Sequence, residues 1–264
     1  MLSKCGVQYA FRYIEGKKIP PAAAMIAGTA VDTAANADLT SKMVVGELEP
    51  EEKILSIARD TVHSKWDEEG VHLSKEELEV GEKIIKGQVV DKSVALAALH
   101  HAQVAPVIEP IAVQRRFRVP LEDFPFDLVG VIDVQEATAV RDLKTAGKSP
   151  SKDTAENSDQ LTFYGLGISA LDGAAPEKLV LDTLVYTPAG NTSIVTLETT
   201  RSDKDYLVQM NRIERAAEVI EGGHFMPARP DDWWCSEKWC GYHSICPYVR
   251  QPVQIAVTKG ETKK

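Results

Sequence analysis

The sequence predicts an α/β fold in which a mixed sheet is flanked by helices. Two observations support this class. Apolar residues recur every three or four positions over much of residues 1–110, the period of amphipathic helices, and the period changes to two after residue 110, as in strands. From there the expected order is three strands, a helix, two strands and a helix, which favours helices layered on a mixed sheet.

Three helices are expected in the first part of the chain. The first covers residues 28–43. The second covers Glu51–Glu69, where Ile54, Ala58, Val62 and Trp66 recur every fourth residue. The third begins at Ser74-x-x-Glu77, which has the form of a capping box, and continues to just before Pro106.

The strands follow. In residues 111–119 the apolar positions 111, 113, 117 and 119 alternate with Gln114, Arg116 and Arg118, which predicts one strand. Further strands are expected at 126–134, 139–144, 179–186 and 193–197. Helices are expected at 160–171 and 202–221, the last ending at Gly222-Gly223. The tail, residues 251–264, is expected to be disordered.

Composition limits the classes of function. The chain has 264 residues, a net charge of −9 and 44% hydrophobic residues, as in a globular protein with a sizeable core. The acidic balance argues against nonspecific coating of nucleic acid, which depends on neutralising phosphates. No stretch approaches the roughly 20 apolar residues of a membrane span, and no signal peptide is recognised. We therefore expect a cytoplasmic protein without a membrane partner.

Two segments carry the chemistry: GVID (residues 130–133) and RDLKT (residues 141–145). Asp142 and Lys144 are two apart on an expected strand, so their side chains share one face while Leu143 faces the core. Asp133 ends the preceding strand, which would lie beside it. Two carboxylates and an ammonium group at one place suit metal-assisted hydrolysis of a phosphodiester, because hard divalent cations prefer oxygen ligands.

Each of these segments, taken alone, is weak evidence for an active site. A D-x-K pattern on a strand is usually an ion pair on a solvated face. Gln160 and Tyr164 are four apart and share a helix face, which is equally common in ordinary helices. The sequence GTAVD (residues 28–32) adds a further carboxylate, Asp32, which in a Thr29-x-x-Asp32 capping box would only stabilise a helix start.

In this order GTAVD, GVID, DLK and QLTFY resemble the nuclease module of the RecB and AddB type within the PD-(D/E)xK superfamily. The resemblance implies a restriction-endonuclease-like fold and a Mg2+ or Mn2+ cofactor. It makes Asp133, Asp142 and the backbone carbonyl of Leu143 metal ligands. Lys144 would be the catalytic lysine, with Gln160 and Tyr164 supporting the site. The family usually carries histidine where this chain has Asp32, so Asp32 is either a replacement metal ligand or a capping residue.

The chain has four cysteines, Cys5, Cys235, Cys240 and Cys246. In a reducing compartment clustered cysteines indicate metal more than disulfides. The resemblance implies a [4Fe-4S] cluster bound by all four, with a structural role. Zinc, His243 in place of Cys5 and unliganded thiols are the alternatives. This arrangement predicts a single domain over residues 1–250: a helical part (1–107), a catalytic core (about 108–222) and a cysteine segment (223–250) joined to Cys5.

Candidate DNA contacts are basic residues on the first strand and in the loop after DLK. They are Arg115, Arg116, Arg118, Lys148 and Lys152. Such residues contact phosphates without reading sequence, although each is equally well explained as a scattered surface charge. Trp233, Trp234 and Trp239 are expected to pack around the cluster, with base stacking as the alternative. The histidines at 63, 72, 100, 101 and 224 are expected at the surface or at helix caps.

The expected function is a metal-dependent DNA nuclease, and by the resemblance an exonuclease in DNA recombination, repair or phage DNA processing. Its partner would be DNA, single-stranded or with free ends. Two alternatives are a catalytically silent DNA-binding scaffold with the same fold, and a CRISPR-adaptation-type nuclease acting with a partner integrase.

Overall fold

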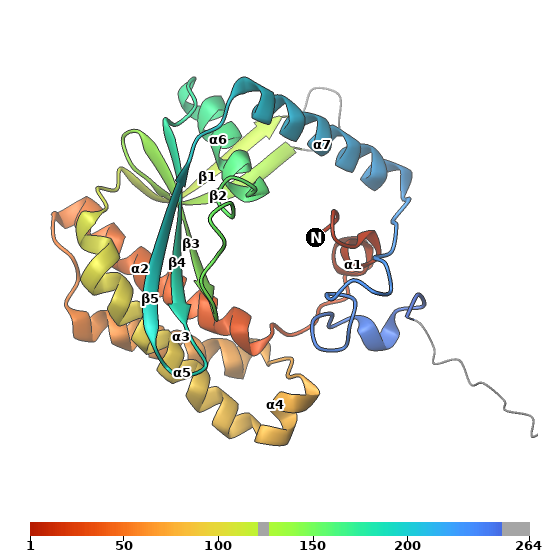
Figure 1. Ribbon diagram of the computed structural model, residues 1–264, viewed down its shortest axis with the longest axis horizontal. Coiled ribbons are helices and arrows are strands. Elements are labelled where there is room, and N and C mark those ends of the chain that lie inside the picture. Colours follow the sequence, from red (N-terminus) through yellow and green to blue (C-terminus); the bar gives the residue numbers. More distant parts are fainter. Residues whose placement is uncertain (121–126, 250–264) are drawn as a thin grey trace, which may run out of the picture. The chain divides into compact units, whose positions relative to one another are not determined.

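The computed structural model describes residues 1–120 and 127–249 (Figure 1). The tail expected to be disordered, residues 251–264, lies outside the described residues. The described residues form two compact units, one of residues 20–221 and one that joins residues 1–19 to residues 222–249. The first unit contains the sheet and the carboxylates. The second contains all four cysteines.

A layer of helices opens the first unit: α2 (Ala23–Val45), α3 (Glu51–Glu69), α4 (Lys75–Val80) and α5 (Glu82–Leu99). Helices α2, α3 and α5 pack against one another. The four residues that predicted the second helix, from Ile54 to Trp66, are all buried in this packing. Helix α2 begins five residues earlier than expected, and Thr29 and Asp32 therefore lie in its interior.

The third expected helix is interrupted. Its start is confirmed, since Ser74 and Glu77 form both hydrogen bonds of a capping box. Gly81 then adopts a left-handed φ of 101°, which ends α4 and starts α5 in a new direction. After α5 the backbone widens into a π-helical turn (His100–Val104) and then tightens into a 3-10 turn (Ala105–Val107).

The sheet has five strands in the order β1-β2-β3-β4-β5. They are β1 (Ala112–Pro120), β2 (Asp127–Gln135), β3 (Ala139–Ala146), β4 (Lys178–Tyr186) and β5 (Thr192–Thr199). All neighbours are antiparallel except β3 and β4, which are parallel and are joined through helix α6 (Asp159–Asp172). A parallel pair needs such a crossover. The expected α/β class with a mixed sheet is confirmed.

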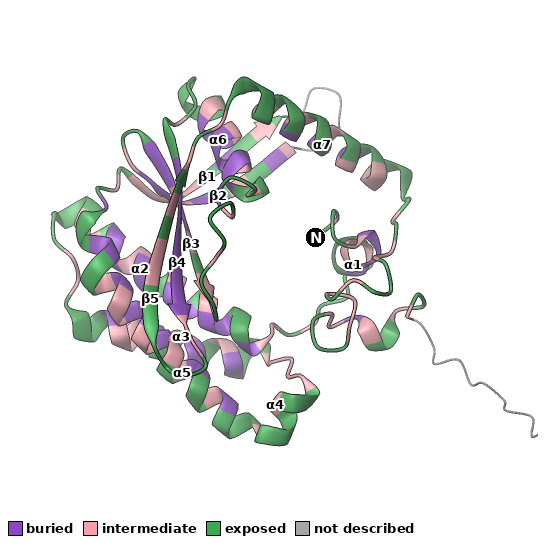
Figure 2. Cartoon of the chain, viewed as in Figure 1, coloured by how far each residue is buried: buried purple, intermediate pink, exposed green. Residues whose placement is uncertain are grey.

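The sheet carries a core on each face. Helix α6 buries Leu161 and Ile168 against Phe117 and Ile132 of β1 and β2. Helices α2 and α5 bury a second cluster on β2 and β4, which includes Val31, Leu96, Val134 and Leu184. Strand β4 is buried along most of its length, whereas β5 at the edge is half exposed (Figure 2). Helix α7 (Asp203–Gly222) follows β5 and packs through Tyr206 against Gly165 of α6.

The second unit has little regular structure. It contains α1 (Gly6–Tyr9), a π-helical turn (Ala10–Ile14) and a 3-10 turn (His243–Ile245). The buried hydrophobic residues in its described part are Val7, Phe11 and Tyr242, against which Cys5, Cys240 and Cys246 pack. A backbone hydrogen bond links the N-terminal and C-terminal segments of this unit, since the Gly6 N–H donates to the Met226 carbonyl at 2.8 Å. Over residues 1–120 and 127–249, no helix is long and apolar enough to cross a membrane.

Candidate active site

The candidate active site lies where β2 and β3 separate. Their antiparallel pairing covers two residue pairs, and Val134↔Arg141 is the last before the strands part. Past this pair, β3 no longer pairs with the backbone of β2. Instead, the Leu143 N–H of β3 donates a hydrogen bond to the side-chain Oδ2 of Asp133 in β2, at 3.2 Å. This fork brings the GVID and DLK segments together at the open edge of β3, with the Leu143 side chain packed into the core.

Asp142 and Lys144 share the face of β3 that the alternation predicted. Lys144 Nζ donates to Asp142 Oδ1 at 2.7 Å, and the lysine side chain is 46% exposed whereas that of Asp142 is 1% exposed. The second oxygen of Asp142, Oδ2, is buried without a hydrogen-bond partner among the described residues. Burial raises the pKa of Asp142 to about 7, against the opposing effect of Lys144. A cation is the natural partner for such an oxygen.

Asp32 lies close enough to this pair to interact with it. It lines a small cavity together with Asp133, Arg141 and Asp182, and its Oδ2 accepts a hydrogen bond from Asn36 Nδ2 at 3.0 Å. Burial, and then the charge of Asp133, raise the pKa of Asp32 to about 6. The capping alternative for Asp32 is wrong, since the residue lies nine positions inside α2 and Thr29 bonds back to the Met25 carbonyl instead.

Helix α6 supplies an uncharged side of the site. Ser158 caps the helix by accepting from the Leu161 N–H, and this places Gln160 and Tyr164 on its first two turns. Gln160 Nε2 donates to Tyr164 Oη at 2.6 Å. The pKa of Tyr164 is raised, first by burial and then by the charges of Asp133 and Asp142, so the phenol stays protonated beside the carboxylates.

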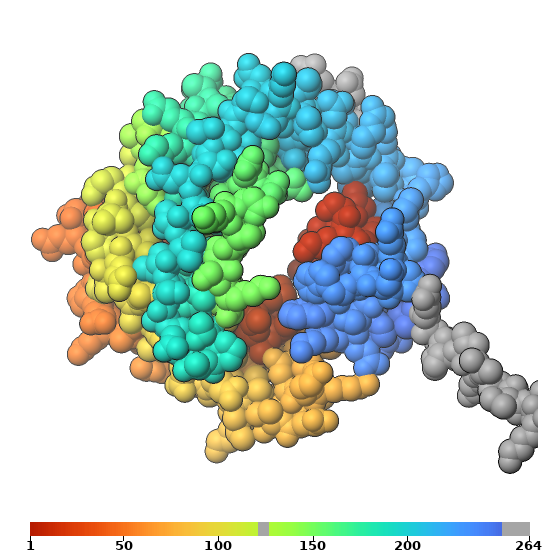
Figure 3. All heavy atoms as spheres, in the orientation of Figure 1, coloured from red at the N-terminus to blue at the C-terminus, as the bar shows by residue number. Residues whose placement is uncertain are grey.

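The expected basic residues divide into two groups. Arg115 is held by other side chains, since its guanidinium makes two hydrogen bonds to Asp172 and one to Gln135. Arg118 pairs with Asp127 but stays exposed. The other three, Arg116, Lys148 and Lys152, are exposed. The segment after β3 that carries both lysines lies at the surface, in green in Figure 3.

Two interactions near the site were not expected from sequence. Asn36 holds Asp32, and its only sequence signal is the spacing of four residues within one helix. His100 is fully buried and lines the same cavity, contrary to the expected surface position. Burial lowers its pKa to about 4, so the imidazole is neutral. His101 pairs with buried Asp38 at 2.8 Å.

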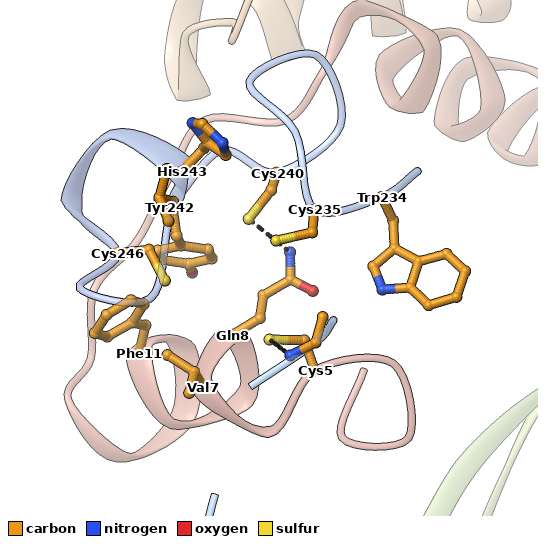
Figure 4. Close-up of a pocket in the computed structure, with 12 residues that line it drawn as sticks. Cys5, Val7, Gln8, Phe11, Trp234, Cys235, Cys240, Tyr242, His243 and Cys246 are labelled. Atoms are coloured by element: carbon orange, nitrogen blue, oxygen red, sulfur yellow. Dashed lines mark hydrogen bonds between the residues drawn. The ribbon is translucent and has the colours of Figure 1, made fainter. Parts of the chain in front are cut away.

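All four cysteines of the second unit line one cavity (Figure 4). Two donors point at sulfur: Ala228 N–H to Cys5 Sγ at 3.4 Å, and Gln8 Nε2 to Cys240 Sγ at 3.8 Å. Burial raises the pKa of Cys240, and the three other cysteines raise it further. Trp234 lines the cavity as expected, whereas Trp233 and Trp239 are 61% and 57% exposed and stack edge-on with each other.

Neither site is gathered as tightly as a filled metal site. Within the described ranges, no three histidine, cysteine, aspartate or glutamate side chains surround one point closely enough to hold a metal ion as they stand. The donor chemistry nevertheless fits. Hard carboxylate oxygens meet at the fork, with one oxygen left without a donor, and soft sulfurs meet in the cavity with N–H donors aimed at them.

Comparison with known proteins agrees with this layout. The sequence model of the PD-(D/E)XK nuclease superfamily matches residues 1–247. No curated protein matches the sequence. The structure titled "putative exonuclease" from Eubacterium rectale has a TM-score of 0.53 and 12% identity over 95% of this chain and 84% of that one, which shows a shared fold. The structure of SSO0001 has 15% identity over 95% and 96% of the two chains, with a TM-score of 0.38. The mixed sheet flanked by helices is thus a restriction-endonuclease-like fold, and the chain belongs to the PD-(D/E)XK nuclease superfamily.

Proposed function

We propose that this chain is a cation-dependent deoxyribonuclease that degrades DNA from an end, with the active-site layout of the RecB and AddB type. The observation that carries the proposal is the buried Oδ2 of Asp142, which lies beside Asp133, meets no hydrogen-bond donor among the described residues, and is within reach of exposed Lys144. A buried carboxylate oxygen without a donor is costly unless a cation meets it. Because the chain belongs to a nuclease superfamily, a cation at this place would serve in phosphodiester hydrolysis.

The chain's own residues divide the work. Asp32, Asp133 and Asp142 would hold Mg2+ or Mn2+, with the Leu143 carbonyl as a further oxygen ligand. When bound, such a cation polarises the phosphoryl group and lowers the pKa of a water. Lys144 stands at the exposed side of the pair, where an ammonium group stabilises charge that develops on the phosphate.

Helix α6 completes the site without adding charge. Gln160 is exposed, and it is oriented by its hydrogen bond to buried Tyr164. An amide held in this way can contact the DNA backbone at a fixed distance from the carboxylates. Phosphate contacts from Arg116, Lys148 and Lys152 would position the strand without selecting its sequence.

Cleavage of end-labelled DNA tests the reaction. We expect purified protein to degrade linear single- or double-stranded DNA with Mg2+ or Mn2+, to be inactive in EDTA, and to spare a covalently closed circle. Asp142→Asn and Lys144→Ala should each lower the rate by about 100-fold or more, the size of a lost transition-state contact. Lys65→Ala, on an exposed face of α3, is the control and should leave the rate unchanged. Equal cleavage by Asp142→Asn and wild type would contradict the proposal.

Asp32 is the residue at which this chain departs from its relatives, and we propose that it is a cation ligand in place of histidine. Asp32→Asn should weaken binding of Mn2+ and slow cleavage at least tenfold, about 1.4 kcal/mol of barrier. Asp32→His should restore part of the rate, because imidazole is also a ligand for Mn2+. A normal rate in Asp32→Asn would leave the cation on Asp133 and Asp142 alone.

We further propose that the four cysteines bind a [4Fe-4S] cluster. Three facts support this: the sulfurs line one cavity, backbone and amide N–H groups point at two of them, and Trp234 Nε1 is buried at the same cavity without a partner in the described part of the chain. A buried N–H without an acceptor has a cost that a negatively charged cluster sulfur, acting as the acceptor, would offset.

Metal analysis decides between iron and zinc. Protein purified without oxygen should be brown, with broad visible absorption and about four irons per chain. Stoichiometric zinc and no iron, in protein made with ample iron, would rule out the cluster. Binding of DNA ends in recombination, repair or phage DNA processing is the biological setting that we propose for this activity, with DNA as its partner.

A further inference from the structure

Gln114 is unusual in its backbone. It lies inside strand β1 with φ of 51°, the only positive φ of a non-glycine residue in residues 1–120 and 127–249. The left-handed region is unfavourable for an L-residue, because its Cβ comes too close to the following carbonyl oxygen. Its side chain is exposed, so burial of the side chain does not explain the conformation. Backbone strain of this kind persists only where neighbouring structure imposes it.

The position of Gln114 in the sheet is the second observation. On either side the strands β1 and β2 pair regularly, through Val113↔Val134 and Arg115↔Ile132. Regular pairing skips the position between them, where Gln114 lies opposite Asp133. The strained residue is thus directly across the ladder from a candidate cation ligand.

The β1–β2 hairpin also changes layers at this pair. Val134 packs in the cluster under α2 and α5, whereas Ile132 packs against α6. Residues two apart in a regular strand share a face. Strand β1 makes the same change, since Val113 joins the first cluster and Phe117 the second. The break in alternation therefore falls at Gln114 on one strand and at Asp133 on the other.

Because of this change of layer, the Asp133 carboxylate does not pack on either face of the sheet. Instead of standing on one side of the sheet, it reaches the edge of β3 and accepts the Leu143 N–H at 3.2 Å. We propose that Gln114 is a positioning residue for Asp133, and that it acts through its left-handed backbone and not through its amide group. The inference rests on the proposed function only in treating Asp133 as a cation ligand.

A substitution series at residue 114 tests the backbone against the side chain. Glycine and asparagine adopt left-handed φ readily, whereas β-branched valine strongly disfavours it. Gln114→Gly and Gln114→Asn should keep the Mn2+ affinity within about threefold of wild type. Gln114→Val should weaken it tenfold or more. Ser193→Val, at an exposed position of β5, is the matched control and should change nothing.

Two measurements make the outcome decisive. Titration calorimetry of EDTA-treated protein with Mn2+ gives the affinity, and hydrogen exchange of the Leu143 amide reports the Asp133 contact without any metal. We expect that protection to persist in the glycine and asparagine variants and to fall at least tenfold in the valine variant, with circular dichroism unchanged. Wild-type protection in Gln114→Val, or equal loss in all three variants, would overturn the inference. Absence of Mn2+ binding by wild type would instead contradict the proposed function, while Leu143 exchange still tests Gln114.

Discussion

The carboxylates and the cysteines, the two groups of side chains that could bind metal, lie on different kinds of structure. The carboxylates stand on strands and a long helix whose cores are closed by apolar contacts, with Val31 and Ile132 fully buried. The cysteines stand on turns and loops, and every one of them is partly exposed. A small unit with three buried hydrophobic residues gains little from burial to offset the entropy of ordering its chain. The sheet unit is therefore expected to fold without the proposed cation, and the cysteine unit to need the proposed cluster.

Removing a cysteine should break this comparison most visibly. If the four cysteines bind the proposed cluster, Cys240→Ser should lose it and, with it, the order of the cysteine unit, a loss on the order of several kcal/mol by loop-closure reasoning. Limited proteolysis should then cut within residues 1–19 and 222–249 and leave residues 20–221 intact. Ser236→Ala, in the same loop, is the control. If Cys240→Ser resists protease as wild type does, the unit does not depend on its metal.

A change in the core of the sheet unit should have the next largest effect. A Cβ at Gly167 of α6 would lie 2.7 Å from the Phe117 ring, and this ring is also in close contact with Gly130 of the GVID segment. Gly167→Ala should therefore destabilise the unit by about 1–3 kcal/mol, as overpacking does. Gly87→Ala, on α5 with open space around it, should instead stabilise by about 0.5–1 kcal/mol. Chemical denaturation followed by far-UV circular dichroism compares the two, and a stabilised Gly167→Ala would show that the ring moves freely.

The third prediction concerns the charge on Asp142 when no cation is bound. Because the folded-state pKa of Asp142 is raised to about 7, its ionisation opposes folding above that pH, and the penalty fades as the pH falls toward 4. In EDTA at pH 8, Asp142→Asn should be more stable than wild type by on the order of 1–2 kcal/mol, a difference that shrinks at pH 5. Added Mn2+ should raise the melting temperature of wild type alone. A less stable Asp142→Asn at pH 8 would mean that its ion pair with Lys144 outweighs burial.

Sequence patterns predicted what local periodicity controls. The strand carrying Asp142 and Lys144 and the helix carrying Gln160 and Tyr164 were both expected, because alternation by two and spacing by four are local properties. The helix start at Ala23 was missed, since Ala22 makes no side-chain cap that the sequence could reveal. That error alone made a capping function for Asp32 look reasonable.

Other features depend on contacts between distant segments. Arg115 makes two hydrogen bonds to Asp172, which lies 57 residues away in the sequence, and no local pattern indicated this pairing. His100 was expected at the surface, yet it is buried in the core at the start of the π-helical turn that follows α5. Gln114 gave no signal at all, because its conformation follows from the layer change of two strands and not from its own residue type. Glycine or asparagine would have marked that position.

The smallest effect is expected at Trp234, where a substitution should shift the reduction potential of the proposed cluster. This prediction tests what the cysteine cavity contains. Its Nε1 is buried at the cavity without a partner among described residues. If the cavity holds an iron–sulfur cluster, this N–H donates to sulfur and stabilises the more negative, reduced state. Trp234→Phe keeps the ring packing and removes the donor. The iron content should be unchanged and the reduction potential should fall by about 20–40 mV, less than about 1 kcal/mol for one electron. Trp239→Phe, which alters an exposed indole, should leave the potential where it was. An equal potential in wild type and Trp234→Phe would place the indole N–H away from sulfur.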